Sequence, residues 1–458
     1  MLPNAISARN MIDTPVLKEL SRRDCSIVFL SNLDTHKAGI ESLGNPLLRW
    51  AKMDLPTGIR SRHRQVLHRV KHKVLLHLHA EFGNLVYRFN EMHGFRAHHQ
   101  KKKLPLRMRE REALSGNYLE VGLGKPFPES KFLQRLLTRF YYGKFWSVAR
   151  EVTEFFDQFK PDLLVLGHCQ HITIADYVRV ARRRRIPMTG IIASWDQPTT
   201  KGPLPISVSH YLVQNASMVE QLEKYHDIPQ NRITITGWPQ MDGYAEDIHY
   251  DRNEWLNSLG FEGDIRYALF AANTPRLGQH EIAIIQHIVE QMTQNSYGKH
   301  CALIIRPHPG DREVMERFSG FEKFKNVILD HDDLNNLHRL HHLLHFANIT
   351  LASGGTFALD SIAHDTPTIG LALSEDESII DRVRQNYTSD HYRELVETGA
   401  ISLCRDFADL DQSLARYLQR DIVDSAELQR AKRQFLTPYD GKASSRIVDT
   451  IFKGVAKV

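Results

Sequence analysis

The chain has 458 residues, of which 42% are hydrophobic and 25% charged, a balance that excludes a disordered or low-complexity scaffold. This length predicts two domains, because one domain ordinarily holds roughly 100–200 residues. No run approaches the about 20 apolar residues that cross a bilayer, and the first residues lack the basic-then-apolar order of a signal peptide. We therefore expect a cytoplasmic protein.

The net charge of +5 hides a strongly basic segment at residues 60–112, in which Lys and Arg alternate with apolar side chains. Such a segment could lie against anionic lipid headgroups at the inner face of a membrane or hold a polyanionic acceptor. A solvated basic helix explains it equally well. No nucleic-acid reader motif accompanies the charge, so we expect no nucleic-acid partner.

In the first half of the chain, strands and helices alternate around one helical segment. Short β-rich apolar runs predict strands at 26–32, 162–167, 186–192, 210–213 and 232–236, with helices at 175–185 and 216–225. Residues 56–150 carry apolar side chains at helical spacing and are predicted to be an inserted helical region. The break at Gly237-Trp238-Pro239 leads us to assign residues 1–245 to an N-terminal domain.

The second half repeats the pattern. Strands are predicted at 267–273, 302–306, 326–329, 349–352 and 368–371, and helices at 279–293, 337–346 and 356–363. Alternation of this kind predicts a doubly wound parallel sheet, because parallel neighbours need a helical crossover. The fold class is therefore α/β with two Rossmann-like domains, the second at 246–458, and a last helix near 444–452 that could cross back to the first.

The most informative motif is Ser353-Gly354-Gly355-Thr356, between a predicted strand and a predicted helix. Small residues at a helix start let a phosphate approach the free N–H groups there. The hydroxyls of Ser353 and Thr356 could add hydrogen bonds, and Asp360 could reach ribose hydroxyls. The alternative is that Ser353 or Thr356 merely caps the helix.

A second motif, Arg306-Pro307-His308-Pro309, ends another strand of the same predicted sheet, at the edge where open α/β sheets bind ligands. His308 could bind a phosphate or protonate a leaving phosphate, and Arg306 could pair with the same charge. A stiff turn with a surface histidine is the alternative. Asn273 and Thr274 follow a third strand and are further donor-binding candidates, or a plain turn.

The N-terminal half offers candidates for the acceptor side. Trp195, Asp196 and Lys201 lie in a polar loop after a strand, where Asp196 could deprotonate an acceptor hydroxyl and Trp195 and Lys201 could bind the acceptor. Trp195 could equally anchor an ordinary loop that Asp196 caps. Asp34 and His36 follow the first strand and compete with Asp196 for the role of base.

No metal or other cofactor is expected. His341, His342 and His345 have helical spacing, but the leucines between them indicate an ordinary amphipathic helix. The cysteines are widely separated and form no CxxC pair, so neither a zinc site nor a disulfide framework is predicted.

The run from Ser353 to Asp360, continued to Pro367-Thr368-Ile369, resembles the nucleotide-binding stretch of GT-B glycosyltransferases. It is also similar to CDP-glycerol glycerophosphotransferases and bacterial polysialyltransferases, in which a His-Pro motif and a pair of hydroxyl residues hold the donor phosphates. His308-Pro309 matches the first motif, and Gly355-Thr356 keeps one hydroxyl of the second. The resemblance covers roughly residues 255–375.

The resemblance implies a glycosyltransferase that moves a sugar from a nucleotide-activated donor to a surface-polysaccharide, lipid-linked or protein acceptor, inverting and without a metal. The related enzymes carry two carboxylates followed by Gly as a base motif, whose nearest counterparts here are Asp34 and Asp196. The alternatives are a CDP-alditol phosphotransferase, a nucleotide-sugar 2-epimerase and a non-catalytic nucleotide-sugar-binding protein.

Overall fold

Strands and helices alternate along most of the chain in the computed structural model, which describes residues 1–31, 33–53, 139, 148–171, 174–200, 204, 208–246, 248, 251–419 and 425–455. The chain divides into unit 1, Met1–Pro239 with Lys442–Val458, and unit 2, Gln240–Gly441. Each unit contains a parallel sheet with crossover helices, so the predicted α/β class with two Rossmann-like domains is confirmed. The basic segment 60–112, most of the predicted insertion at 56–150 and Lys201 lie outside the described residues.

Unit 1 contains a two-stranded and a four-stranded parallel sheet, ordered β1-β2 and β3-β4-β5-β6. Its strands are β1 (Ile27–Ser31), β2 (Leu48–Lys52), β3 (Leu164–Leu166), β4 (Met188–Ile191), β5 (His210–Val213) and β6 (Ile233–Ile235). Its helices are α1 (Ala5–Ile12), α2 (Pro15–Ser21), α3 (Lys37–Glu41), α8 (Arg150–Phe159), α9 (Ala175–Arg184), α10 (Gln197–Thr200), α11 (Ala216–His226) and α21 (Ala443–Val455), with 3-10 turns η1 (Asp34–His36) and η3 (Gln230–Arg232).

The first two residues link the sheets of unit 1. Leu2 N donates to Leu30 O at 2.8 Å, and Gly167 N donates to Met1 O at 2.9 Å. Leu2 also forms a parallel bridge with Ser31. This short segment therefore lies between the ends of β1 and β3.

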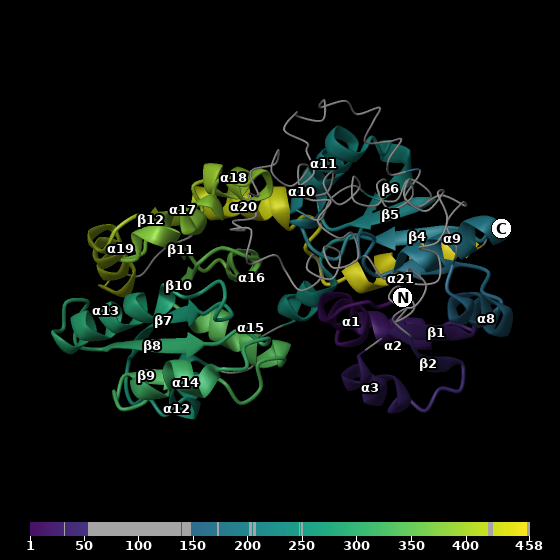
Figure 1. Cartoon of the computed structure of the whole chain (residues 1–458). Helices are drawn as coiled ribbons and strands as arrows, with labels where there is room; N and C mark the ends of the chain where they lie inside the picture. Colours follow the sequence, from purple (N-terminus) through teal and green to yellow (C-terminus); the bar gives the residue numbers. More distant parts are fainter. Residues whose placement is uncertain are drawn as a thin grey trace, which may run out of the picture. The chain divides into compact units, whose positions relative to one another are not determined.

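The last helix, α21, belongs to the core of unit 1. Ile447, Val448 and Ile451 lie in one buried cluster with side chains of α1, α2 and β1. Figure 1 shows α21, in yellow, beside the purple N-terminal helices. The division between the units falls after Pro239, a few residues before the predicted boundary at 245.

Unit 2 is built on a six-stranded parallel sheet. Its strands are β7 (Arg266–Ala271), β8 (Cys301–Arg306), β9 (Val327–Leu329), β10 (Ile349–Ala352), β11 (Thr368–Leu371) and β12 (Ile401–Cys404). Its helices are α12 (Arg252–Ser258), α13 (Glu281–Thr293), α14 (Val314–Phe318), α15 (Leu337–Phe346), α16 (Phe357–Ala363), α17 (Glu377–Gln385), α18 (Asp390–Glu397), α19 (Phe407–Gln419) and α20 (Ala426–Phe435), with η4 (Pro239–Ala245) and η5 (Ser319–Phe321).

The strand order β12-β11-β10-β7-β8-β9 places the first and fourth strands of unit 2 side by side. Counted along unit 2, this is the Rossmann order 3-2-1-4-5-6, and the order reverses between β7 and β10. Helices leave the sheet in opposite directions on the two sides of this switch point. Ligands of open α/β sheets bind there, outside the carboxyl ends of the strands.

Alternate side chains of β7 bury against helices on opposite faces of the sheet, as expected for a doubly wound fold. Ala268 and Phe270 belong to a core cluster with side chains of α13 and α19. Tyr267 and Leu269 belong to a second cluster with side chains of α12 and α15. Figure 1 shows α13 and α12 on the two sides of this sheet.

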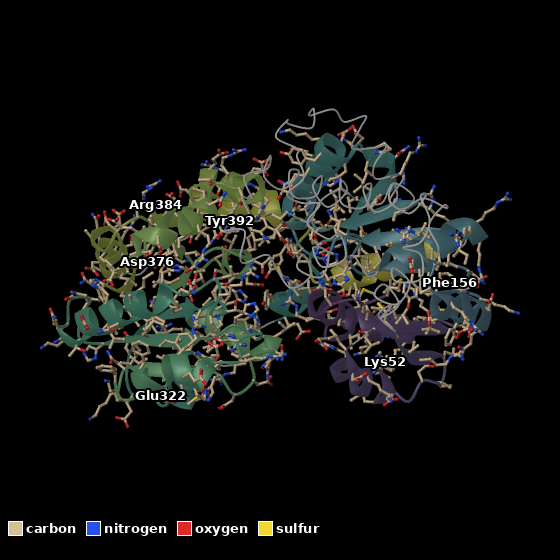
Figure 2. The ribbon with its side chains drawn as sticks, viewed as in Figure 1. Lys52, Phe156, Glu322, Asp376, Arg384 and Tyr392 are labelled. Carbon is tan, nitrogen blue, oxygen red and sulfur yellow. The ribbon has the colours of Figure 1, made fainter. Side chains whose placement is uncertain are left out.

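Several helices of unit 2 begin at side-chain caps. Asp376, labelled in Figure 2, precedes α17, and its carboxylate accepts from Ser378 N at 2.9 Å. Asn336 caps α15 through Arg339 N at 2.9 Å.

In the part of the chain that the structure describes, no helix combines the length and the apolarity that crossing a membrane requires.

Candidate functional site

Three loops of unit 2 leave the same edge of the sheet at the switch point. Ala352 of β10 pairs with Ala271 of β7, and Ala271 pairs with Arg306 of β8, so the last residues of three neighbouring strands lie in register. We call the segments that follow them, residues 273–278, 307–311 and 353–356, the edge loops. They contain most of the donor-binding residues predicted from the sequence.

The loop after β10 has a backbone conformation that depends on its two glycines. Gly354 and Gly355 have φ of +90° and +89°, a conformation that favours glycine. Within the described part of the chain, the N–H groups of Gly354, Gly355 and Thr356 donate to no other protein group. Because α16 starts at the next residue, these amides and the first turn of that helix can together bind a phosphate.

Thr356 occupies the cap position of α16 without capping it. Its side chain makes no capping hydrogen bond, so the capping alternative does not describe it. Ser353, in contrast, is buried, and His280 Nε2 lies 3.1 Å from its Oγ. Of the two hydroxyls, Thr356 is therefore the one placed to meet a ligand.

His308 is exposed at the end of β8 with a defined tautomer. Its Nδ1 accepts a hydrogen bond from Gly310 N at 2.9 Å, so in the neutral ring the proton resides on Nε2. The residue that follows the turn is tied back, because Asp311 N donates to His308 O at 2.8 Å. The loop thus presents an N–H donor at the carboxyl edge of the sheet.

Thr274 lies near this histidine. A Cβ added to Gly310 would lie 3.1 Å from His308 Nδ1 and 3.9 Å from Thr274 Cγ2. The loops after β7 and β8 therefore meet around Gly310. Thr274 and His308 border the same small space.

Arg306 is held in the interior. Its guanidinium donates to the Asp330 carboxylate and, through Nη2, to Leu334 O at 3.0 Å. Asp330 also accepts from Arg339. Through these contacts Arg306 connects the segment after β9 to β8, and its contact with a donor phosphate stays a prediction.

Asp360 lies in α16 and is largely buried. The hydroxyl of Tyr244 donates to its Oδ1 at 3.2 Å, and His364 Nδ1 donates to its backbone oxygen at 2.7 Å. The carboxylate therefore stands on the helix that begins at the glycine turn, with its direction set by a tyrosine from η4. Its contact with a ribose stays a prediction.

A layer of buried polar residues supports the edge loops, and the sequence analysis did not find it. Glu281 is fully buried and accepts from Asn273 N at 2.8 Å. Arg317 donates to Asn273 O at 2.8 Å and to the Asp311 carboxylate. The available signal was the run Gln279-His280-Glu281 opening an otherwise apolar helix.

His280 is neutral in this layer. Burial, and secondly the charge of Arg382, lower the pKa of His280 to about 4. A neutral imidazole carries one proton, and with Nε2 on Ser353 the ring can hold the serine hydroxyl in place without adding charge.

Comparison with known proteins identifies the relationship. The family model described as CDP-Glycerol:Poly(glycerophosphate) glycerophosphotransferase matches residues 204–453, more than half of the chain. The chain belongs to this family. It is therefore a member of a transferase family, and the edge loops lie within the matched residues.

Solved structures resemble the chain at low identity. The Staphylococcus aureus MnaA–UDP complex is 13% identical over 100% of this chain and 96% of that chain, with a TM-score of 0.50. The UDP-GlcNAc 2-epimerase of Methanocaldococcus jannaschii is 16% identical over 99% and 98%, with a TM-score of 0.49. The wall teichoic acid polymerase TagF is 18% identical over 55% of this chain and 59% of that chain, with a TM-score of 0.39. No curated protein matches by sequence.

The predicted base candidates lie outside the residues that match the glycerophosphotransferase family. Asp34 is exposed at the start of η1, and His36 Nε2 lies 3.2 Å from Asp13 Oδ2. Asp196 accepts from the Thr200 hydroxyl at 2.8 Å, and its backbone oxygen accepts from Thr200 N at 2.9 Å. Asp196 thus closes the turn of α10.

Trp195 is buried, as in the alternative that makes it the anchor of an ordinary loop. It lies in the loop between β4 and α10, in the interior of unit 1. Its role in binding an acceptor stays a prediction, as does that of Lys201.

The histidines of α15 pack in an aromatic cluster. His341 Nδ1 lies 2.7 Å from His364 Nε2, and the His341 ring stacks on Tyr244 with centroids 5.5 Å apart. Within the described ranges, no group of three or more His, Cys, Asp or Glu side chains is arranged to hold a metal.

Proposed function

We propose that this chain transfers an alditol-phosphate unit from a CDP-activated donor to a hydroxyl of a polymeric, lipid-linked or protein acceptor. The observation that carries the proposal is the set of three edge loops at the switch point, within the residues that match the glycerophosphotransferase family. Open α/β sheets bind nucleotides at this point.

In this proposal the donor diphosphate lies on the glycine turn. The N–H groups of Gly354, Gly355 and Thr356 and the Thr356 hydroxyl would donate to its oxygens. His308 Nε2–H would donate to the phosphate from the neighbouring loop, and Asn273 and Thr274 complete the edge. Asp360 would accept from a ribose hydroxyl. Arg306 would act by holding β8 rather than by touching the donor.

The reaction would break one phosphoanhydride bond. The acceptor oxygen attacks the phosphorus that carries the alditol, the bond from that phosphorus to the bridging oxygen breaks, and CMP leaves with that oxygen. The hydroxyl proton passes to a base, for which Asp34, His36 and Asp196 remain the candidates. Fixed amide donors and a helix start stabilise the charge that develops on the phosphates without reorganising during the reaction.

Sugar transfer from a nucleotide sugar is the second candidate. It is favoured by Gly355, which stands where the resembling phosphotransferases carry a second hydroxyl residue. In that reaction the acceptor attacks the anomeric carbon with inversion, and a nucleoside diphosphate leaves.

The products separate these candidates. The purified protein is incubated with CDP-glycerol, or with UDP-, GDP- and CMP-linked sugars, together with polyol-phosphate and glycan acceptors, and the released nucleotides are separated by chromatography. CMP released from CDP-glycerol only when acceptor is present supports the proposal. Nucleotide release from sugar donors alone would replace it by glycosyl transfer, and a product formed without acceptor would indicate epimerisation.

Independence from metal is a separate prediction of the proposal. After dialysis against EDTA, the rate with the accepted donor should be unchanged, because backbone amides and His308 take the place of a divalent cation. A rate that is lost in EDTA and restored by Mg²⁺ would contradict it.

A further inference from the structure

We infer that Glu281 is a positioning residue that holds the three edge loops in one arrangement, and that donor-phosphate binding depends on its carboxylate. The inference rests on the proposed function for its ligand, but its structural part concerns unit 2 alone. Glu281 is the first residue of α13, and its side chain has no exposed surface. Burying a carboxylate is costly unless donors surround it.

In the part of the chain that the structure describes, the hydrogen-bond and ion-pair partners of this carboxylate are donors. Asn273 donates from its backbone N at 2.8 Å and from Nδ2 at 3.3 Å, and Arg317 Nη2 lies 3.7 Å from Oε2. Burial raises the pKa of Glu281 above its usual range, although the hydrogen bonds from Asn273 and the charge of Arg317 act in the opposite direction. A set composed of donors matches the ionised form, which only accepts.

Glu281, the adjacent His280 and Arg317 together reach all three edge loops. Glu281 accepts from Asn273 N after β7, and His280 Nε2 lies 3.1 Å from the Ser353 hydroxyl after β10. Arg317 donates to Asn273 O, to Gly278 O at 3.2 Å and to the Asp311 carboxylate after β8. Since Asp311 N is bonded to His308 O, the histidine turn is part of the same framework.

Ser353 is connected to the same layer through His280. Its hydroxyl lies 3.1 Å from His280 Nε2, and His280 is the residue before Glu281. The Ser353 carbonyl, at the start of the glycine turn, accepts from Asn386 Nδ2 at 3.2 Å. These contacts give Ser353 a structural role, and its hydroxyl contact with a phosphate stays a prediction.

The loop after β7 packs closely against the Glu281 carboxylate. A Cβ added to Gly278 would lie 2.1 Å from Glu281 Oε2 and 3.2 Å from Arg317 Nη2. The backbone of the loop after β7 thus approaches the carboxylate as closely as a glycine allows. Exchanging an oxygen of Glu281 for an N–H group should therefore displace or loosen the backbone of that loop.

The test compares Glu281→Gln with Asp411→Asn. The Gln amide would turn an N–H group toward groups that are themselves donors. Asp411 is the control, a partly exposed carboxylate of α19 that accepts from His287 Nε2 at 2.9 Å and from the Tyr297 hydroxyl, neither of which belongs to an edge loop. Two readouts are used: amide hydrogen exchange without ligand, and calorimetric titration with CDP and with inorganic pyrophosphate.

We expect Glu281→Gln to accelerate exchange in residues 273–278, 307–311 and 353–356 together, and to weaken CDP and pyrophosphate binding by about tenfold or more. Asp411→Asn should change neither, even where it lowers the melting temperature as much. With an active enzyme, the donor KM should rise while kcat and the acceptor KM change little. Equal exchange in Glu281→Gln and the parent protein would overturn the inference.

Ser353→Ala keeps the test decisive if Glu281→Gln does not fold. This substitution removes only the contact between Ser353 and His280. Amide exchange should therefore rise in residues 353–356 and stay unchanged in residues 273–278. If exchange does not rise in residues 353–356, Ser353 does not hold that loop. If the parent protein binds neither probe, the proposed function fails, and hydrogen exchange alone then decides whether Glu281 couples the loops.

Discussion

At the scale of single residues, the two nitrogens of His308 have different tasks. Nδ1 accepts from Gly310 N and closes the turn after β8, while Nε2 carries the proton. An asparagine can imitate the first nitrogen and a glutamine the second, because their polar atoms lie one and two carbons beyond Cβ. The two substitutions therefore separate the turn from the chemistry.

We predict that His308→Asn lowers kcat/KM by about a hundredfold, the ordinary contribution of one positioned proton donor. His308→Gln, which keeps an N–H near the position of Nε2, should retain more activity than His308→Asn. Steady-state kinetics measure both, with thermal unfolding as the control. Equal activity in the two variants, or a large loss of melting temperature in either, would assign His308 to the turn alone.

Gly355 differs from Gly354 in what a side chain would meet. A Cβ on Gly354 would lie 3.3 Å from Asn386 Cβ, whereas a Cβ on Gly355 meets nothing within 4 Å. Substitution of Gly355 therefore tests the backbone conformation of the turn without a clash.

We predict that Gly355→Ala weakens nucleotide binding by about tenfold and costs about 1–2 kcal/mol of unfolding free energy, because φ of +89° is unfavourable for alanine. Gly320→Ala is the matched control, since its Cβ also meets nothing and its φ is not positive. Calorimetric titration and urea unfolding measure the two effects. Undiminished binding by Gly355→Ala would argue against the glycine turn as the phosphate site.

At the scale of elements, α15 and α16 of unit 2 are joined by two histidines. His364 Nδ1 donates to Asp360 O, and His341 Nδ1 lies 2.7 Å from His364 Nε2. When both rings are neutral, His364 has its proton on Nδ1 and His341 has its proton on Nδ1, between the two rings. His341 Nε2, 3.3 Å from Glu246 O, then carries no proton. Protonation of the pair would add one there, and burial opposes this added charge.

Acid should therefore destabilise unit 2. Burial lowers the pKa of His341 to about 4 and of His364 to about 3, with neighbouring histidines adding to the effect, and the pKa of His280 is also about 4. These pKa values lie below the value of about 6.5 that histidine has in the unfolded chain. At pH values between the folded and the unfolded pKa, the unfolded chain therefore binds more protons than the folded chain. Stability is complete above pH about 6.5 and falls as the pH drops toward about 4.

Urea unfolding of unit 2 at pH 7.5 and pH 5.0 measures this loss. We predict that His364→Gln, whose amide cannot titrate, is less stable than the parent at pH 7.5 but loses less on acidification. An equal loss in the parent and the variant would show that other groups control the acid transition.

At the scale of the whole molecule, unit 1 is formed by two separate parts of the sequence, Met1–Pro239 and Lys442–Val458. Helix α21, at the end of the sequence, contributes Ile447, Val448 and Ile451 to the core that contains α1 and α2. Unit 2 lies between the two parts of unit 1 in sequence. A change in α21 should therefore act on the N-terminal core.

We predict that Ile447→Ala destabilises unit 1 by about 2–5 kcal/mol, the usual cost of emptying a buried aliphatic site. Hydrogen exchange should show greater opening in α1, α2 and β1 than in β7 to β12. Saturating donor should raise the stability of unit 2 by about 2.7 kcal/mol at a hundredfold excess over its Kd. The opposite pattern, with Ile447→Ala opening β7 to β12, would contradict this assignment of α21.

The sequence by itself determined the elements whose pattern is local and complete. Strands 210–213, 349–352 and 368–371 and helix 337–346 agree with β5, β10, β11 and α15, because each is a short apolar run or an amphipathic run that the local sequence shows by itself. Strands β2 and β12 and helices α17 to α20 were not predicted. The two strands are short and lie at the edge of a sheet, so their patterns are correspondingly weak.

Only the tertiary structure decided which residues of the candidate site touch. The motifs after β8 and β10 were recognisable because parallel strands place their following loops at one edge, which is a rule of the fold. The hydrogen-bond partners of Arg306, Ser353 and Glu281 could not be recognised from the sequence. His280 and Ser353 are 73 residues apart, and Arg306 and Asp330 are 24 residues apart. Hydrogen bonding at such separations depends on strand order and helix packing, which no local pattern contains.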